Sequence, residues 1–271
     1  MKKYIILAIS FLFINEIIFA QQKDTSLGTV FYTFKHMVDT NNKTYFREEN
    51  MGLHLGKFLN EYFSIDKLKK DSIVKAQIEQ SGGMVINTSG KKVTSTKIFT
   101  NKIAKKIVVN ETLLKLYYYD DIYPAIDWKI MDAMKEIGRI KCTKAIGNYK
   151  GRTYEAWFTT ELGIEGAPWK LSGLPGLVLE AYDLKMQVQF LFAGLEQNSD
   201  KNIVFNSIPQ NGIQTTKKDF LQLKEAASNN PAAFINSASS DAGLGFKISS
   251  DNSAGNFKPK KLSNPVELND N

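Results

Sequence analysis

The sequence predicts an α+β protein that is mainly antiparallel β, with one large curved sheet and two or three helices. Short segments rich in β-branched and aromatic residues recur along the chain, and Gly, Asn or Pro punctuate many of the intervals between them. Two longer segments instead have apolar residues at helical spacing. With 271 residues, 43% of them hydrophobic, the chain can bury one substantial core. We expect an open sheet that resembles half of a barrel.

The first 20 residues have the pattern of a signal peptide. Lys2 and Lys3 precede an apolar run over residues 4–13, and Ala20 stands at a suitable cleavage position. The alternative is a membrane anchor, but this apolar run is about half of the roughly 20 residues that a spanning helix needs. We therefore expect an exported protein with no transmembrane span in the mature chain, and a single domain over residues 21–236.

A series of strands and two helices is expected within that domain. The expected strands cover residues 28–40, 44–56, 92–101, 105–112, 113–122, 138–146, 152–159, 177–183, 186–196 and 202–208. The helices are expected at 64–83 and 215–228, where Ser64 and Thr216 can cap the first turns. Residues 237–271 are rich in Ser, Asn, Gly, Asp and Lys, and this composition predicts a largely disordered tail.

Charge and cysteine content bound the possible partners. The net charge is +7, but the basic residues fall in separate short runs without a stripe of stacking aromatics, so we expect no nucleic-acid partner. Cys142 is the only cysteine, and the chain therefore has no internal disulfide. Because no ligand spacing recurs around Cys142, His36 or His54, we expect no metal site and no cofactor.

The segment SGLPG places two glycines and a proline within four residues. Gly173 can take a positive φ, and Pro175 fixes its own φ while it pushes Leu174 towards extended geometry. Gly176 suits the last central position of a type II turn, where φ is positive. We expect a rigid corner that directs residues 177–183 into the sheet.

This corner has two interpretations. In the first, it serves packing alone. In the second, its backbone and the polar and aromatic side chains near it form a binding surface for an apolar or peptide ligand, or for a receptor. The candidate binding residues are Arg152, Trp157, Trp169, Lys170, Gly173, Leu174, Pro175, Gly176 and Glu180.

Residues 151–183 resemble the signature region of the GLPGLI family of exported Bacteroidetes proteins, also called the Porph_ging family. The resemblance includes the arm GRTYEAWF at 151–158, the PWK segment at 168–170 and the naming motif at 173–178. The sequence NPVEL at 264–268 is similar to a short C-terminal ending common in that family.

The resemblance extends over essentially the whole chain, with mild departures at Ala167, Leu171 and Val178. Genes of the family are often found near those of TonB-dependent outer-membrane receptors. The resemblance therefore implies a periplasmic, outer-membrane-associated or secreted protein whose partner is such a receptor. It implies no defined activity, because a shared family is a weak argument for function.

We expect a non-enzymatic accessory or binding protein, and two alternatives stay open. One is an envelope hydrolase that uses Cys142 as nucleophile with His36 or His54 as base. Such a hydrolase could instead use a carboxylate pair, drawn from Glu161, Glu165, Glu180 and Asp183. The other alternative is a structural or surface-interaction protein, for which a flat patch rather than a pocket is expected.

Overall fold

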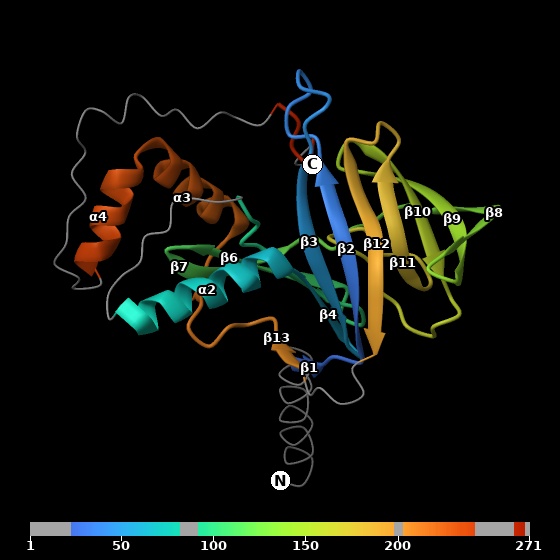
Figure 1. Ribbon diagram of the computed structural model, residues 1–271, viewed down its shortest axis with the longest axis horizontal. Helices are drawn as coiled ribbons and strands as arrows, with labels where there is room; N and C mark the ends of the chain where they lie inside the picture. Colours follow the sequence, from blue (N-terminus) through green and yellow to red (C-terminus); the bar gives the residue numbers. More distant parts are fainter. Residues whose placement is uncertain (1–22, 82–91, 198–202, 242–262, 269–271) are drawn as a thin grey trace, which may run out of the picture.

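The computed structural model describes residues 23–81, 92–197, 203–241 and 263–268 (Figure 1). The predicted signal peptide, residues 1–20, lies outside the described residues. Most of the described chain belongs to one large sheet, and three helices gather to one side of it in Figure 1.

The large sheet has twelve strands in the order β14-β7-β6-β5-β4-β3-β2-β12-β11-β10-β9-β8 among the described residues. Its strands are β2 (Gly28–His36), β3 (Arg47–Leu55), β4 (Leu59–Ser64), β5 (Lys97–Asn101), β6 (Lys106–Leu113), β7 (Lys115–Asp121), β8 (Lys129–Ile137), β9 (Ile140–Tyr149), β10 (Arg152–Thr159), β11 (Leu177–Asp183), β12 (Val188–Gln197) and β14 (Ile213–Gln214). A separate pair joins β1 (Lys23–Thr25) to β13 (Val204–Asn206).

The predicted fold class is confirmed, because the sheet is mainly antiparallel, is not closed into a barrel and is accompanied by helices. The one parallel strand pair of the described sheet is β14 with β7. Alternation along β2 shows why these residues form strands. Val30, Tyr32 and Phe34 are buried on one face, and Phe34 stacks on Phe190 of β12 with ring centroids 5.0 Å apart.

The sheet is strongly curled, and the long connection between β10 and β11 crosses its concave face. The amide of Asn60 on β4 donates to the main-chain oxygen of Glu165 in that connection, at 3.0 Å. Lys170, also in the connection, forms an ion pair of 2.7 Å with Asp121 at the end of β7. The strands β7 and β10 are far apart in the sheet order, so only a curled sheet lets one connection contact both regions.

The helices are α2 (Ile65–Ser81), α3 (Lys217–Asn229) and α4 (Pro231–Asp241). Both predicted caps are present. The Ser64 hydroxyl accepts a hydrogen bond from the main-chain N–H of Lys67, and the Thr216 hydroxyl accepts one from the N–H of Asp219. The sequence Asn-Asn-Pro ends α3 as expected. It also begins α4, because the side chain of Asn230 accepts from the N–H of Ala233.

The strands β1, β4, β8 and β14 are not among the expected ones. The hairpin β8–β9 has a two-residue turn, Gly138–Arg139, with positive φ at both positions (58° and 67°). The hairpin β9–β10 turns at Lys150–Gly151 in the same way (47° and 78°), which is shorter than the expected turn at 147–151. Both pairs suit type I′ turns, and this turn type matches the twist of the two strands that it joins.

The C-terminal region differs from the predicted disordered tail at both of its ends. Helix α4 continues to Asp241, and Asn264 in the segment 263–268 is buried. Residues 242–262 and 269–271 lie outside the described residues. The segment 263–268 lies beside the end of β2 (Figure 1). Within the described residues, none of the helices is both long enough and apolar enough to span a bilayer.

Candidate functional site

The corner of the SGLPG motif is a three-residue turn centred on Pro175. The N–H of Gly176 donates to the carbonyl of Leu174 at 2.9 Å, which is the i to i+2 bond of a γ-turn. The expectation of a type II turn is therefore wrong, and Gly176 does not have a positive φ. Position 176 requires a glycine for close packing instead, because a Cβ there would lie 2.1 Å from the carbonyl oxygen of Thr159.

The residue of the motif with a positive φ is Gly173, at 110°. The indole of Trp128 holds the preceding residue, since its N–H donates to the carbonyl of Ser172 at 3.1 Å. Beyond the corner, the N–H of Val178 donates to the carbonyl of Gly166 at 2.8 Å. These bonds fix the loop 172–176 at both ends, as the sequence predicted for a rigid corner.

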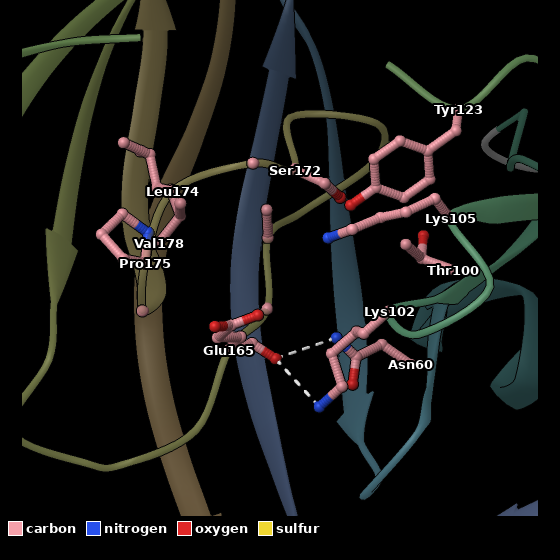
Figure 2. Close-up of a pocket in the computed structure, with 14 residues that line it drawn as sticks. Asn60, Thr100, Lys102, Lys105, Tyr123, Glu165, Ser172, Leu174, Pro175 and Val178 are labelled. Carbon is pink, nitrogen blue, oxygen red and sulfur yellow. Dashed lines mark hydrogen bonds between the residues drawn. The ribbon is translucent and has the colours of Figure 1, made fainter. Parts of the chain in front are cut away.

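The motif loop forms one wall of a cavity of about 190 Å³ (Figure 2). We call this cavity the motif pocket. Its lining includes Gly173, Leu174, Pro175 and Gly176, all four of them candidate residues from the sequence. Across the concave face, its other residues include Asn60, Thr100, Lys102, Lys105, Tyr123 and Glu165.

Two lysines give the motif pocket its basic character. The Lys102 ammonium donates to the carbonyl of Gly56 at 2.8 Å, and lies 3.4 Å from the carbonyl oxygen of Glu165 (Figure 2). Burial lowers the pKa of Lys102 below its ordinary value, although the nearby carboxylates oppose the shift. The exposed Lys105 extends towards the motif loop, with its ammonium 5.3 Å from the ring centroid of Tyr123. Such a pocket can bind a small ligand that carries an acceptor or a negative charge.

Arg152 and Lys170 do not line the motif pocket, because both are buried against the C-terminal segment 263–268. The Arg152 guanidinium pairs with Asp183 at 2.9 Å and donates to Asn264 and to two main-chain oxygens of that segment. Lys170 pairs with Glu267 at 2.6 Å and also with Asp121. Burial alone would lower the pKa of Lys170, but these two carboxylates outweigh it and raise that pKa.

Trp157 lies on the opposite face of β10 from Arg152, because five positions along a strand change the face. Its indole N–H donates to Glu155 at 2.9 Å, and the Lys135 ammonium lies 4.5 Å from its ring centroid. Lys135 also pairs with Glu180 at 2.6 Å. Trp157 and Glu180 thus belong to one polar cluster, which is separate from the motif pocket.

Trp169 has a φ of 53° and packs among aromatic rings inside the curled sheet. Its ring is nearly parallel to that of Phe190 at a centroid distance of 6.1 Å, and it meets Tyr149 edge-on at 5.5 Å. The candidate binding residues therefore do not form one surface. They lie in four places: the motif pocket, the contact with residues 263–268, the polar cluster of Trp157 and Glu180, and the aromatic packing around Trp169.

The residues proposed for a cysteine hydrolase are not assembled. Cys142 is buried in the core, its thiol lies 3.5 Å from the Ile140 carbonyl, and burial raises the pKa of the thiol to about 11. The His36 ring bonds to the main-chain oxygen of Asn264, and the His54 ring bonds to the hydroxyl of Thr29. Burial lowers the pKa of both histidines. Within the described residues, no cluster of three or more His, Cys, Asp or Glu side chains could hold a metal ion.

The carboxylates considered for an acid–base pair have separate roles. Asp183 accepts hydrogen bonds from Arg152 and from the main-chain N–H groups of Gln187 and Val188. Glu180 is paired with Lys135. Glu161 and Glu165 are exposed.

A second recess is larger, about 540 Å³, and mostly apolar. Its walls include Leu27, Leu55, Leu162, Leu177 and Leu195. Leu27 is 56% exposed there. This recess could receive an apolar ligand or chain.

Sequence reasoning missed Lys102, Lys105, Tyr123 and Trp128, because their contacts with the motif depend on how the sheet curls. It also missed the role of Asn264. The one available signal was the similarity of NPVEL to a family ending, since a defined short motif in a polar tail suggests a specific contact.

The comparisons with known proteins bear on the fold. No protein-family model matches the chain, and no curated protein matches it. Two solved structures of PNGF-II, from two space groups, match 73% and 72% of this chain with TM-scores of 0.52 and 0.50. The sequence identities are 13% and 12%, and the chain spans about a third of the length of those solved chains, 32% in each case. At such identities, the similarity establishes a shared β-rich fold alone.

Proposed function

We propose that this chain is an exported, envelope-associated accessory or binding protein of the GLPGLI family. In this proposal it is non-enzymatic, holds a small ligand in the motif pocket and works with a TonB-dependent outer-membrane receptor. One observation carries the binding role: the motif loop 172–176 forms one wall of a cavity that also contains Lys102 and Lys105.

The chemistry of the pocket favours a small ligand with a carboxylate or phosphate group. Lys102, Lys105, Asn60 and the Tyr123 hydroxyl supply hydrogen-bond donors, and two ammonium groups exceed the single negative charge of Glu165. The cavity of about 190 Å³ is smaller than a typical drug-sized site of about 300–1,000 Å³. It therefore suits a small anion, or the charged end of a longer molecule.

The test compares Lys105→Gln with Lys106→Gln in the mature protein. Both changes remove one positive charge, but the Lys106 ammonium pairs with Asp120 on the neighbouring strand. Each protein is used to recover partners from native envelope, and the recovered proteins and small molecules are identified by mass spectrometry. We expect an anionic small molecule to be lost with Lys105→Gln and kept with Lys106→Gln. Equal recovery by both variants would contradict the proposal.

Arg152→Ala and Trp169→Ala are unsuitable variants for that test. Arg152 is buried in an ion pair and Trp169 packs among aromatic rings, so both changes disturb folding. The receptor role has its own readout in the same experiment. If a receptor is bound, its peptides should be identified in the material recovered with the unaltered protein. Their absence would contradict the receptor role and leave the ligand role to the lysine comparison.

An apolar ligand is the second candidate, and the leucine-lined recess favours it. Leu27→Gln places an amide at its exposed edge and leaves the motif pocket unchanged. If a fluorescent fatty-acid probe binds the unaltered protein and loses affinity with Leu27→Gln but not with Lys105→Gln, the apolar recess is the ligand site. Unchanged binding in both variants would exclude both pockets for that probe.

The cysteine-hydrolase alternative receives no support from the contacts of Cys142. A buried thiol with a raised pKa is a poor nucleophile, and both histidines are engaged elsewhere.

A further inference from the structure

A third recess lies on the face of the sheet opposite the motif pocket. Its floor contains side chains of four adjacent strands: Glu61 of β4, Lys97 and Phe99 of β5, Asn110 of β6 and Leu116 of β7. Glu61 pairs with Phe99 across the strands and Lys97 pairs with Asn110. Because Lys97 and Phe99 are two positions apart, all four side chains share one face. Asn60, which lines the motif pocket, precedes Glu61 along β4 and therefore faces the other side.

Helix α2 and strand β13 form the walls of this recess, which we call the outer recess. The first turns of α2 contribute Lys67, Leu68 and Asp71, and β13 contributes Val204 and Phe205. The volume of the recess is about 360 Å³, within the range of about 300–1,000 Å³ that is typical of small-ligand sites. Leu68 and Val204 are about half exposed, so the walls offer apolar surface that a ligand can cover.

The charges that line the outer recess cancel. Lys97 pairs with Glu61 at 2.8 Å, and Lys67 pairs with Asp71 one helical turn further along α2. These are the four charged side chains of the described lining, so the recess offers no net charge to a ligand. The motif pocket differs, because its two lysines exceed its single glutamate. An uncharged ligand therefore suits the outer recess better than the anion proposed for the motif pocket.

Asn110 brings a buried polar group to the recess. It is 4% exposed, and its side-chain Oδ1 is buried without a hydrogen-bond partner among the described residues. Asn60 is equally buried, but its amide donates to the carbonyl of Glu165 and accepts from the N–H of Gly56. A buried polar group without a partner costs free energy, and most such groups in proteins are satisfied. A ligand hydroxyl can donate to Oδ1 of Asn110, and a half-turn of the amide presents Nδ2 as a donor instead.

Side-chain hydroxyls also line the recess near Asn110. Ser95 and Thr96 directly precede Lys97, the cross-strand partner of Asn110, and Thr112 lies two positions further along β6. A hydroxyl group both donates and accepts hydrogen bonds, as an amide group does, and the hydroxyls of a sugar can match both. The apolar side chains of the walls can pack on the C–H groups of a sugar ring.

We propose that the outer recess binds a neutral sugar or polyol, which is held by the Asn110 amide and by the hydroxyls of Ser95 and Thr96. The site lies on the other face of the sheet from the motif pocket and does not depend on a ligand there.

The test titrates the full mature chain with glucose, galactose and mannose, and follows binding by saturation-transfer difference NMR. We expect saturable binding of at least one of these sugars, with a dissociation constant of about 1–10 mM. That sugar should bind about tenfold or more weakly to Asn110→Leu, which removes the amide. Asn148→Leu makes the same change at an exposed position of β9 and should leave the affinity within about threefold. No saturable binding of any of the three sugars up to about 50 mM, or equal binding by Asn110→Leu, would overturn the proposal.

Charged sugars test the neutrality of the site. Glucuronic acid and glucosamine each carry one charge on the same kind of ring, and both should bind more weakly than the best neutral sugar. Tighter binding of either one would overturn the assignment of a neutral ligand.

Stability measurements separate a binding role of Asn110 from a structural one. Because its Oδ1 has no partner in the described chain, Asn110→Leu should leave the urea midpoint unchanged or raise it, whereas Asn60→Leu should lower it. A midpoint lowered as much as that of Asn60→Leu would show that Asn110 serves the fold, contrary to the proposal. If Asn110→Leu does not fold, Thr96→Val replaces it, because Thr96 is half-buried in the segment before β5 and valine keeps its shape. Thr96→Val should weaken sugar binding about threefold or more, and an unchanged affinity would overturn the proposal.

Discussion

Arg152 and Lys106 form ion pairs with the same N–O distance, 2.9 Å, and differ in burial. The side chains of Arg152 and Asp183 are 2% and 3% exposed, whereas those of Lys106 and Asp120 are 55% and 59% exposed. Arg152→Ala leaves Asp183 buried without its cation and removes three hydrogen bonds to the segment 263–268. Removal of one partner from a buried pair lowers the free energy of unfolding by about 3–5 kcal/mol. The exposed pair contributes less than about 1 kcal/mol.

Urea unfolding followed by circular dichroism measures both changes. With a slope of about 2–3 kcal/mol per molar, Arg152→Ala should lower the urea midpoint by about 1–2 M, and Lys106→Ala by less than about 0.5 M. Arg152→Lys should fall between them, because a lysine keeps the charge and loses the planar fork that reaches several acceptors. A loss below about 1 kcal/mol for Arg152→Ala would refute the view that this buried contact secures the C-terminal segment.

Three further outcomes follow from the structure. Gly176→Ala should destabilise the fold by about 1–3 kcal/mol, because its Cβ would meet the backbone of Thr159. Thermal unfolding measures this loss. The loss should be smaller for Gly163→Ala, where φ is 61° but a Cβ meets nothing within 4 Å. Cys142 should react with a thiol reagent at pH 8 only after denaturation, and rapid labelling of the folded protein would contradict its burial and raised pKa. Burial depresses the folded-state pKa of His36 below 6.5, so its neutral form stabilises the fold above pH 6.5 and this stability is lost as the pH falls through the folded pKa. Urea midpoints from pH 8 to pH 5 should fall less steeply for His36→Gln than for the unaltered protein. Equal slopes would show that protonation of His36 does not cause the loss of stability.

The sequence predicted the sheet and two helices because they depend on local periodicity, and it predicted their caps because a Ser or Thr stands before each first turn. It missed β8 because Met134 is 73% exposed on this edge strand and the burial pattern is irregular. A register shift between Ile130 and Met134 interrupts the alternation that identifies a strand. It also missed α4, because the proline that ends one helix can stand in the first turn of the next.

The backbone of the candidate site could be predicted from local sequence, but its partner residues could not. The motif was identified correctly as a corner, since Pro175 restricts its own φ and Gly173 permits a positive φ whatever surrounds them. The partner residues of that corner come from β4, β5, the turn between β5 and β6, and the segment after β7. Their approach depends on the curl of the sheet, and no pattern within a single strand encodes it. A buried role for Arg152 was equally hidden, because Asn264 is 112 residues away in sequence.

The curl also explains why the C-terminal segment matters to the fold as a whole. Lys170 in the β10–β11 connection and Lys217 at the start of α3 both contact Asp121 and Glu267. Two cations and two carboxylates thus balance in charge at the place where β7 faces the motif connection. The open sheet has no strand pairing between these two regions among the described residues, so side-chain contacts must hold them together. Glu267 belongs to the segment that Arg152 also secures. The same six residues therefore contact β10, β2 and α3 directly, and they are linked to β7 through Lys170 and Lys217.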